Sequence, residues 1–193
     1  MVLSDTFGHP AQMPQILRGF GIDNAVIYRG VQSETSEFVW EAPDGSSVLT
    51  VYLPEGYWNA VQVSIAPHRF LDRVDEIVDG LGRRSATGNI LLMNGFDHLA
   101  PRGGIEQTIA EANRRLSESV VLQQGTLPQY IERVKLAGAR LKTVRGEFRC
   151  GRPARITPGV ISSRMYLKLE NFKSEVALEK YAEPISALSW LLG

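Results

Sequence analysis

The stretch Glu37-Phe38-Val39-Trp40-Glu41-Ala42-Pro43-Asp44-Gly45-Ser46-Ser47-Val48-Leu49-Thr50-Val51-Tyr52-Leu53 decides the fold. Its first five residues and the run 47–53 are rich in aromatic and β-branched side chains, a composition typical of strands. Between the two runs lies Pro-Asp-Gly, whose residues favour a tight turn. The stretch therefore predicts two antiparallel strands joined as a hairpin.

Segments typical of helices and strands alternate on both sides of this hairpin. Apolar side chains recur at helical spacing between 70 and 81, and short apolar runs at 24–28 and 90–93 indicate strands buried on both faces. In chain order we predict a helix over 14–20, a strand over 24–28, the hairpin, a helix over 70–81, a strand over 90–93, a helix over 105–116, a strand over 120–122, a helix over 128–136 capped by Thr126, an extended segment over 141–148 and a long helix over 162–192 that Pro184 kinks or ends. This alternation predicts an α/β fold with a parallel sheet.

Composition limits the partners and the location that we expect. The 21 Lys and Arg residues balance 21 Asp and Glu residues, so nothing indicates binding to nucleic acid or to an anionic membrane. Cys150 is the single cysteine of the 193 residues, which fits a reducing compartment. No apolar stretch is long enough to span a bilayer, and the first residues lack the pattern of a signal peptide. We therefore expect a cytoplasmic protein with no membrane partner.

Four segments, taken in order, carry a family resemblance. They are Asp5-Thr6-Phe7-Gly8-His9-Pro10-Ala11-Gln12-Met13-Pro14-Gln15-Ile16-Leu17, then Gly30-Val31 followed by 37–45, then Leu92-Met93-Asn94-Gly95-Phe96-Asp97-His98, and finally Gly159-Val160-Ile161-Ser162-Ser163-Arg164-Met165-Tyr166-Leu167-Lys168. Any one of them alone is a weak signal, but four in order are a strong one. Together the segments resemble glycoside hydrolase family 38, the α-mannosidases, in its bacterial form.

The resemblance implies a retaining α-mannosidase that acts on α-mannoside oligosaccharides or glycosides. It also implies a catalytic α/β barrel of seven strands, followed by a three-helix bundle. On this basis we expect residues 1–158 to be the C-terminal part of the seven-stranded (β/α) barrel, and residues 159–193 to be the first helix of the bundle. A zinc ion that clamps two mannose hydroxyls and a nucleophilic aspartate are further features that the resemblance implies.

Two departures from the family pattern concern the metal and the nucleophile. The resemblance places a His-x-Asp zinc motif and the nucleophilic aspartate upstream of the Asp5 segment, and the region 152–158 contains no histidine that could add a ligand. Zinc is therefore expected for the full-length enzyme, while its ligands in this chain stay unknown. We expect the isolated chain to be inactive, and we expect a further partner to be the N-terminal half of the barrel.

Asp97 and His98 follow the predicted strand at 90–93, and residues after the strands of such barrels face the active site. Asp97 is the candidate catalytic acid/base, and Asn94 and His98 are candidate substrate-binding residues. The alternative is that Asp97 caps a turn and that His98 is solvated.

Asp5, His9 and Tyr57 complete the set of candidate substrate-binding residues. Asp5 and His9 come where an earlier strand would end, so they line the pocket or support it through hydrogen bonds, unless Asp5 caps the following helix. Tyr57 begins the run Tyr57-Trp58-Asn59, which suits stacking and hydrogen bonding to a sugar ring. The alternative is a Trp58 that packs in the core beside an exposed Tyr57.

Two other functions stay open at this point. The chain could be a non-catalytic carbohydrate-binding or assembly module derived from the same barrel, which would keep Tyr57, Asp97 and His98 without the chemistry. It could also have a structural role, since half a barrel exposes strand edges that pair with a complementary chain.

Overall fold

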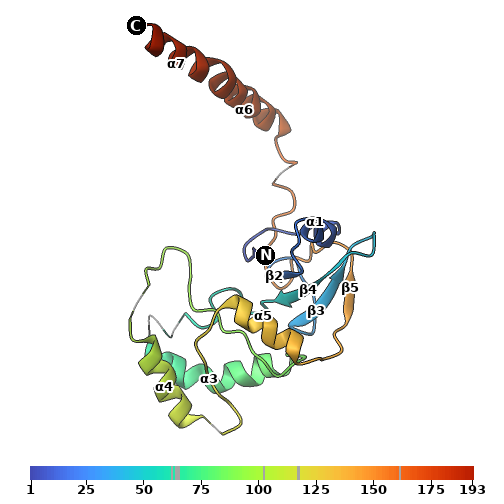
Figure 1. Cartoon of the computed structure of the whole chain (residues 1–193), viewed down its shortest axis with the longest axis vertical. Coiled ribbons are helices and arrows are strands. Elements are labelled where there is room, and N and C mark those ends of the chain that lie inside the picture. The colour runs from blue at the N-terminus through green and yellow to red at the C-terminus, as the bar shows by residue number, and fades with distance from the viewer. Residues whose placement is uncertain (62, 64–65, 102, 117, 161) are drawn as a thin grey trace. The chain divides into compact units, whose positions relative to one another are not determined.

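The computed structural model describes residues 1–193 except 62, 64–65, 102, 117 and 161. It divides into two compact units, Met1–Ile156 and Thr157–Gly193 (Figure 1). Ile161, which belongs to the fourth of the family-like segments, lies outside the described residues. Whether the two units are a catalytic barrel and the start of a helical bundle stays a prediction.

A mixed five-stranded sheet in the order β1-β2-β4-β3-β5 is the centre of the first unit. Its strands are β1 (Val2–Leu3), β2 (Asn24–Ile27), β3 (Glu37–Glu41), β4 (Ser47–Tyr52) and β5 (Thr143–Arg145). β1, β2 and β4 are parallel, and β5 is parallel to β3. β3 and β4 form the predicted antiparallel hairpin, with Trp40 opposite Val48. The α/β class is confirmed, whereas a seven-stranded barrel stays a prediction.

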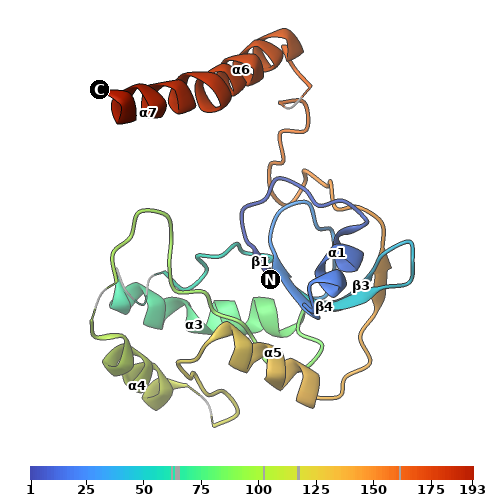
Figure 2. The same cartoon turned by 45° about the horizontal axis from the view of Figure 1, so that its top comes forward.

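Both faces of the sheet are buried, which explains the continuous apolar runs of its strands. The helices of this unit are α1 (Met13–Gly19), α3 (Pro67–Gly82), α4 (Ile105–Arg115) and α5 (Leu127–Leu136). Leu17 of α1 packs with Ile27 and Trp40 on one face of the sheet. Val134 of α5 packs with Val26 on the other face, so α1 and α5 cover opposite sides (Figures 1 and 2).

The predicted helices form where the sequence supplies their boundary signals. Thr126 caps α5, because its hydroxyl oxygen accepts from the Gln129 amide at 3.4 Å while the Gln129 side chain accepts from the Thr126 amide at 2.8 Å. α3 buries Phe70 and Ile77 from its apolar side in a cluster that Ile105 of α4 also contacts. The amphipathic patterns therefore predicted these helices correctly.

Two predicted strands are absent from the described part of the chain, at 90–93 and at 120–122. The segment 90–93 is half-buried and is bonded by residues 59–60 in place of a strand: the Asn59 side chain bonds the Leu91 carbonyl and the Met93 amide, and the Ala60 amide donates to the Met93 carbonyl at 3.0 Å. Val121 is 77% exposed. Apolar runs mark segments that could pair, but a strand forms only where a partner backbone lies alongside.

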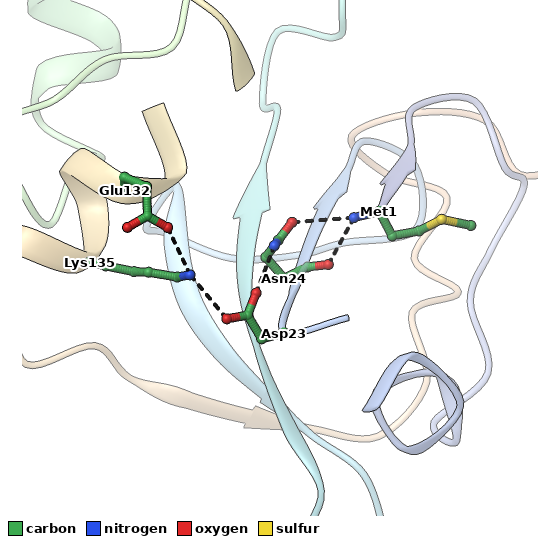
Figure 3. A network of polar contacts seen from close by, with 5 residues as sticks. All are labelled: Met1, Asp23, Asn24, Glu132 and Lys135. Atoms are coloured by element: carbon green, nitrogen blue, oxygen red, sulfur yellow. Dashed lines mark hydrogen bonds and ion pairs between the residues drawn. The ribbon is translucent and has the colours of Figure 1, made fainter. Parts of the chain in front are cut away.

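A network of polar side chains ties α5 to the amino end of β2 (Figure 3). The Lys135 ammonium lies 3.0 Å from carboxylate oxygens of both Asp23 and Glu132. The Asn24 amide donates to Asp23 at 2.8 Å, and the amino group of Met1 donates to the Asn24 backbone at 3.1 Å. Hydrogen bonds from Asn24 and Lys135 lower the pKa of Asp23. This network lies at the edge of the sheet where β2 begins.

The second unit is helical from residue 165 onward. α6 (Met165–Ala177) and α7 (Glu183–Leu192) are separated by a π-helical segment, Leu178–Ala182. Pro184, predicted to kink or end the helix, lies in the first turn of α7. Because proline lacks an N–H and its ring crowds the carbonyl four residues earlier, a wider turn before it relieves the conflict. A three-helix bundle stays a prediction.

Among the described residues, no helix is both long and apolar enough to cross a membrane.

Candidate functional site

The carboxyl ends of the three parallel strands bring polar and aromatic residues to one edge of the sheet. Asp5 follows β1, Tyr28 and Arg29 follow β2, and Tyr57 and Trp58 follow β4. Parallel strands end at the same edge, which is where α/β folds place their sites. This edge is opposite the network of Asp23 and Lys135.

Arg29 holds the Asp5 carboxylate in place. Its Nε donates to Asp5 Oδ1 at 2.6 Å, and its Nη1 donates to the backbone carbonyl of Arg155 at 2.8 Å. The guanidinium also lies 4.4 Å from the centre of the Phe7 ring, within cation–π range. The Arg29 side chain is 18% exposed and that of Asp5 is 42% exposed. The carboxylate is therefore oriented by a fixed cation and still faces solvent.

Four aromatic rings form a continuous cluster beside this pair. Tyr28 and Tyr57 each contact Trp58 edge to face, with ring centres 5.3 Å and 4.8 Å apart respectively. Phe96 contacts Trp58 at 5.3 Å and lies nearly parallel to Tyr57 at 6.4 Å. Phe96 is 48% exposed, so the cluster presents part of an aromatic face to solvent.

Tyr57 bonds one carboxylate, that of Asp97, and lies within the electrostatic influence of a second, that of Asp5. Its hydroxyl donates to both oxygens of Asp97, at 3.3 Å and 3.2 Å. Burial raises the pKa of Tyr57, the negative charge of Asp5 raises it further, as do the hydrogen bond and charge of Asp97, and Arg29 opposes them. The tyrosine is thus a hydrogen-bond donor through the neutral range. The structure brings three of the predicted residues, Asp5, Tyr57 and Asp97, to one place.

The other predicted residues lie elsewhere or have other partners. His98 is exposed, and its φ of 63° places its backbone in the left-handed region. Asn94 is also exposed, two residues before Phe96. Asn59, which the sequence offered as a sugar-binding amide, is instead buried and bonds the backbone of Leu91 and Met93. It supports the segment that leads to Asp97, while roles for Asn94 and His98 in binding stay predictions.

His9 is buried in the core, at 2% exposure. Its ring makes edge-to-face contacts with Trp40 and Phe148, at centre distances of 6.1 Å and 6.4 Å. No side chain in the described part of the chain bonds either ring nitrogen, and the nearest polar group is the backbone of Arg29. Burial lowers the pKa of His9, and the backbone of Arg29 opposes that shift. A hydrogen-bond network around His9 and a role of this residue in substrate binding both stay predictions.

Residues 1–147 match the N-terminal domain of the glycosyl hydrolases of family 38. The chain belongs to glycosyl hydrolase family 38. It is 29% identical over 201 residues to a protein of Halalkalibacterium halodurans that is provisionally named a mannosylglycerate hydrolase, covering 95% of this chain and 22% of that protein. It is 35% identical over 85 residues to α-mannosidase G of Dictyostelium discoideum, covering 38% of this chain and 8% of that protein.

A solved structure shares the fold of this family 38 chain. The crystal structure of an α-mannosidase from Enterococcus faecalis superposes with a TM-score of 0.70 at 25% identity, over 76% of this chain and 17% of that one. The chain thus spans about a fifth of the length of the bacterial relatives that it matches. The family match and the shared fold identify the first unit as part of a family 38 N-terminal domain.

Three members of the site in this family 38 domain were missed from the sequence: Phe7, Arg29 and Phe96. Phe7 and Phe96 lie in segments that carry the family resemblance, and Arg29 lies next to a predicted strand. Arg29 follows the predicted strand 24–28 directly, and that position was the available signal. Phe7 and Phe96 stand two residues after Asp5 and one before Asp97, so their proximity to candidate acids was a second signal.

The zinc ion expected for the family finds no complete site in the described residues. Among them, no three His, Cys, Asp or Glu side chains gather closely enough to hold a metal. Asp5 is ion-paired with Arg29, and Asp97 is bonded by Tyr57. The described residues do not by themselves fit the ion, and we derive no chemical step through it.

Proposed function

We propose that this chain is part of a retaining α-mannosidase and carries the face of the active site that binds the α-mannoside. Family membership and the α-mannosidases among its relatives support the class of reaction. The observation that supports the location is the convergence of Asp5, Tyr57 and Asp97 at the carboxyl ends of parallel strands. A balanced charge supports a neutral sugar over a nucleic acid as partner.

The two carboxylates around Tyr57 have the composition that a retaining glycosidase needs. Such enzymes use one carboxyl group as general acid/base and a second carboxylate as nucleophile. In this proposal Asp97 is the acid/base, with the Tyr57 hydroxyl fixing its orientation. Asp5 is the second carboxylate, kept in place by Arg29. The proposal moves the nucleophile from the upstream region, where the resemblance placed it, into this chain.

The aromatic cluster would supply the apolar side of the same site. The half-exposed ring of Phe96 and the neighbouring Tyr57 offer a flat surface for the C–H face of a pyranose. The carboxylates of Asp5 and Asp97 would accept hydrogen bonds from the sugar hydroxyls on its edge. An amphipathic ligand with one apolar face and a polar rim fits this combination.

We expect a bound zinc ion only in the full-length enzyme, not in the isolated chain. Since the described residues do not gather a metal site, we expect the isolated chain to bind α-mannosides and not to turn them over. The N-terminal half of the barrel is the proposed partner that completes the site. The cytoplasmic location likewise stays a prediction, supported by the single Cys150.

The test is a titration of the chain with methyl α-mannoside, followed by ligand-observed NMR, with methyl β-mannoside as the comparison sugar. Phe96→Ala is expected to raise the dissociation constant about two- to tenfold, the equivalent of one aromatic contact. Tyr57→Phe is expected to raise it about fivefold, since it removes one hydrogen bond to a charged group. Phe20→Ala is the matched control, because Phe20 is 80% exposed at the end of α1 and outside the cluster.

The outcomes separate the competing functions. The placement of the site would be contradicted if Phe20→Ala weakened binding as much as Phe96→Ala does. It would also be contradicted if the wild-type chain did not bind the sugar. Binding that is unchanged in Asp5→Asn and Asp97→Asn would favour the non-catalytic module, because the carboxylates would then have no part in it. Hydrolysis of an aryl α-mannoside by the isolated chain would contradict the expected lack of turnover.

A further inference from the structure

One segment of the first unit crosses the edge of the sheet beside the candidate site. This crossing segment, residues 146–156, follows β5 and contains no helix or strand of its own apart from isolated bridges to the loops beside it. The amide of His9 donates to the Phe148 carbonyl at 3.0 Å, and the Phe148 amide donates back to the His9 carbonyl at 2.9 Å. The Cys150 amide donates to the Gly30 carbonyl at 2.9 Å. The crossing segment thus joins the loop after β1 to the loop after β2.

The fit of the crossing segment on these loops is close. Gly30 has φ 85°, and a Cβ at this position would collide with the Phe148 carbonyl. The Phe148 ring packs on Trp40 at a centre distance of 4.4 Å, and Ala154 and Ile156 are buried. Further along, the Arg155 carbonyl accepts from Arg29 Nη1 at 2.8 Å. Displacing the crossing segment would therefore remove one of the two side-chain hydrogen bonds of Arg29.

His9 is the ionisable side chain that is buried beneath the crossing segment. Its ring is enclosed by Trp40 and Phe148, and within the described residues no side chain bonds either ring nitrogen, while the Arg29 backbone lies near the ring. A neutral imidazole tolerates such a cage, whereas an imidazolium needs solvent or a partner for both N–H groups. The cage offers at most the backbone of Arg29 to one of these N–H groups, so protonation and this packing oppose each other.

The charged groups described around His9 are engaged with one another and not with its ring. On the first two loops Asp5 and Arg29 pair with each other, and Arg29 faces His9 with its backbone. On the crossing segment Glu147 and Arg149 pair with each other at 3.5 Å, with exposed side chains. The remaining polar neighbours have partners of their own: the Trp40 indole N–H donates to the Gly146 carbonyl, Glu41 pairs with Arg145, and the Cys150 thiol donates to Gln32. Within the described residues His9 has no carboxylate at ion-pair distance.

We propose that His9 is an acid-sensitive lock on the crossing segment: its neutral ring holds residues 146–156 against the loops that carry Asp5 and Arg29, and its protonation releases them. The inference does not depend on the proposed sugar chemistry, since it rests on the cage alone. In the released state the imidazole is solvated and titrates near about 6.5. Because burial lowers the pKa of His9 in the closed state, the closed form is favoured fully above about pH 6.5. It is lost as the pH falls below that value, by up to about tenfold in the opening equilibrium per pH unit.

The test is amide hydrogen exchange of peptides covering 146–156 at pH 7.5 and pH 5.5, with rates corrected for the intrinsic effect of pH. Wild type is expected to lose about tenfold in protection at the lower pH. His9→Phe keeps an aromatic ring in the cage and removes the proton site, so its protection is expected to stay the same at both values. His68→Gln, an exposed histidine at the start of α3, is the matched control and is expected to behave like wild type.

An equal loss of protection in wild type and in His9→Phe would overturn the proposal. If His9→Phe does not fold, the titration of the His9 ring in the wild-type chain, followed by NMR, decides instead. A midpoint below about 6.5, together with broadening of the Phe148 signals as the ring protonates, is expected. A midpoint at or above that value would show that the cage accepts the charge, and the lock would not exist.

Discussion

Tyr130→Phe tests whether the buried bond between α5 and the sheet stabilises the first unit. The Tyr130 hydroxyl donates to Glu37 Oε1 at 2.7 Å, and Glu37 is 1% exposed. Burial raises the pKa of Tyr130, and the neighbouring Glu37 charge raises it further, so the hydroxyl is a donor at any pH at which the protein folds. The second carboxylate oxygen of Glu37 accepts from the Ala86 amide at 2.7 Å.

Removing the hydroxyl leaves a buried carboxylate with one of its two hydrogen bonds. A hydrogen bond to a charged group contributes about 1.5–3 kcal/mol, so we expect the free energy of unfolding to fall by about 2 kcal/mol. For a chain of this size that corresponds to about 4–8 °C in the melting temperature. The measurement is urea unfolding followed by circular dichroism, with the slope against urea concentration checked for constancy.

Tyr52→Phe is the control for this measurement. Tyr52 lies on β4 at 3% exposure, and the described residues offer its hydroxyl no hydrogen bond. Its loss is expected to change stability by less than about 0.5 kcal/mol. If Tyr130→Phe cost no more than Tyr52→Phe, the reasoning that the buried carboxylate depends on its tyrosine partner would be refuted.

Three further predictions concern stability. Gly30→Ala is expected to cost more than about 2 kcal/mol in urea unfolding, because φ 85° is strained for alanine and its Cβ would collide with Phe148; an unchanged midpoint would refute the close approach. Thr126→Ala should lower helix stability by about 1 kcal/mol, measured by thermal unfolding, and a Thr126→Asn variant should restore most of it. Lys135→Met should remove part of the stability that the lowered pKa of Asp23 gives above about pH 4, so the two proteins should converge as the pH falls below that value, in unfolding curves recorded between pH 3 and 7. A difference that persists at pH 3 would assign the effect to packing.

The hairpin and the helices could be predicted because local patterns alone determine them. The residues from Glu37 to Tyr52 form two runs typical of strands around a Pro-Asp-Gly turn, and these two strands pair with each other, so no distant segment is needed. Thr126 and Gln129 complete a capping box within four residues. In each case the residues that form the contact are close in sequence, and the pattern contains both partners.

The two predicted strands that the described chain lacks, at 90–93 and 120–122, show where local patterns are no longer sufficient. The residues 90–93 are apolar enough for a central strand, but the ladder also requires backbone donors and acceptors from another segment. In the described chain the side chain of Asn59 takes that place, bonding the Leu91 carbonyl and the Met93 amide. Nothing in the local sequence of either segment indicates that pairing, because it joins residues more than thirty positions apart.

The candidate site was predictable in part for a geometric reason. Tyr57 and Asp97 follow predicted strands, and Asp5 stands where an earlier strand was expected to end; Asp5 and Tyr57 do follow the parallel strands β1 and β4. Asp97 joins them although its strand does not form, because Asn59 holds the segment before it and the Tyr57 hydroxyl binds its carboxylate. His9 also follows β1, six positions beyond its last residue, but it lies in the core, where its backbone pairs with that of Phe148. The rule therefore locates the edge but not the direction of each side chain.

The two acids of the proposed pair, Asp5 and Asp97, differ in the contacts that hold their carboxylates in place. Asp5 is fixed by Arg29, which is itself anchored to the Arg155 carbonyl and to the end of a strand within the sheet. Asp97 is fixed by Tyr57 and, through the segment 91–93, by Asn59, and neither contact involves a backbone ladder. A retaining glycosidase needs its nucleophile held firmly and its acid/base able to donate and then accept a proton. A rigidly paired Asp5 and an Asp97 held by a single neutral donor match that division of roles.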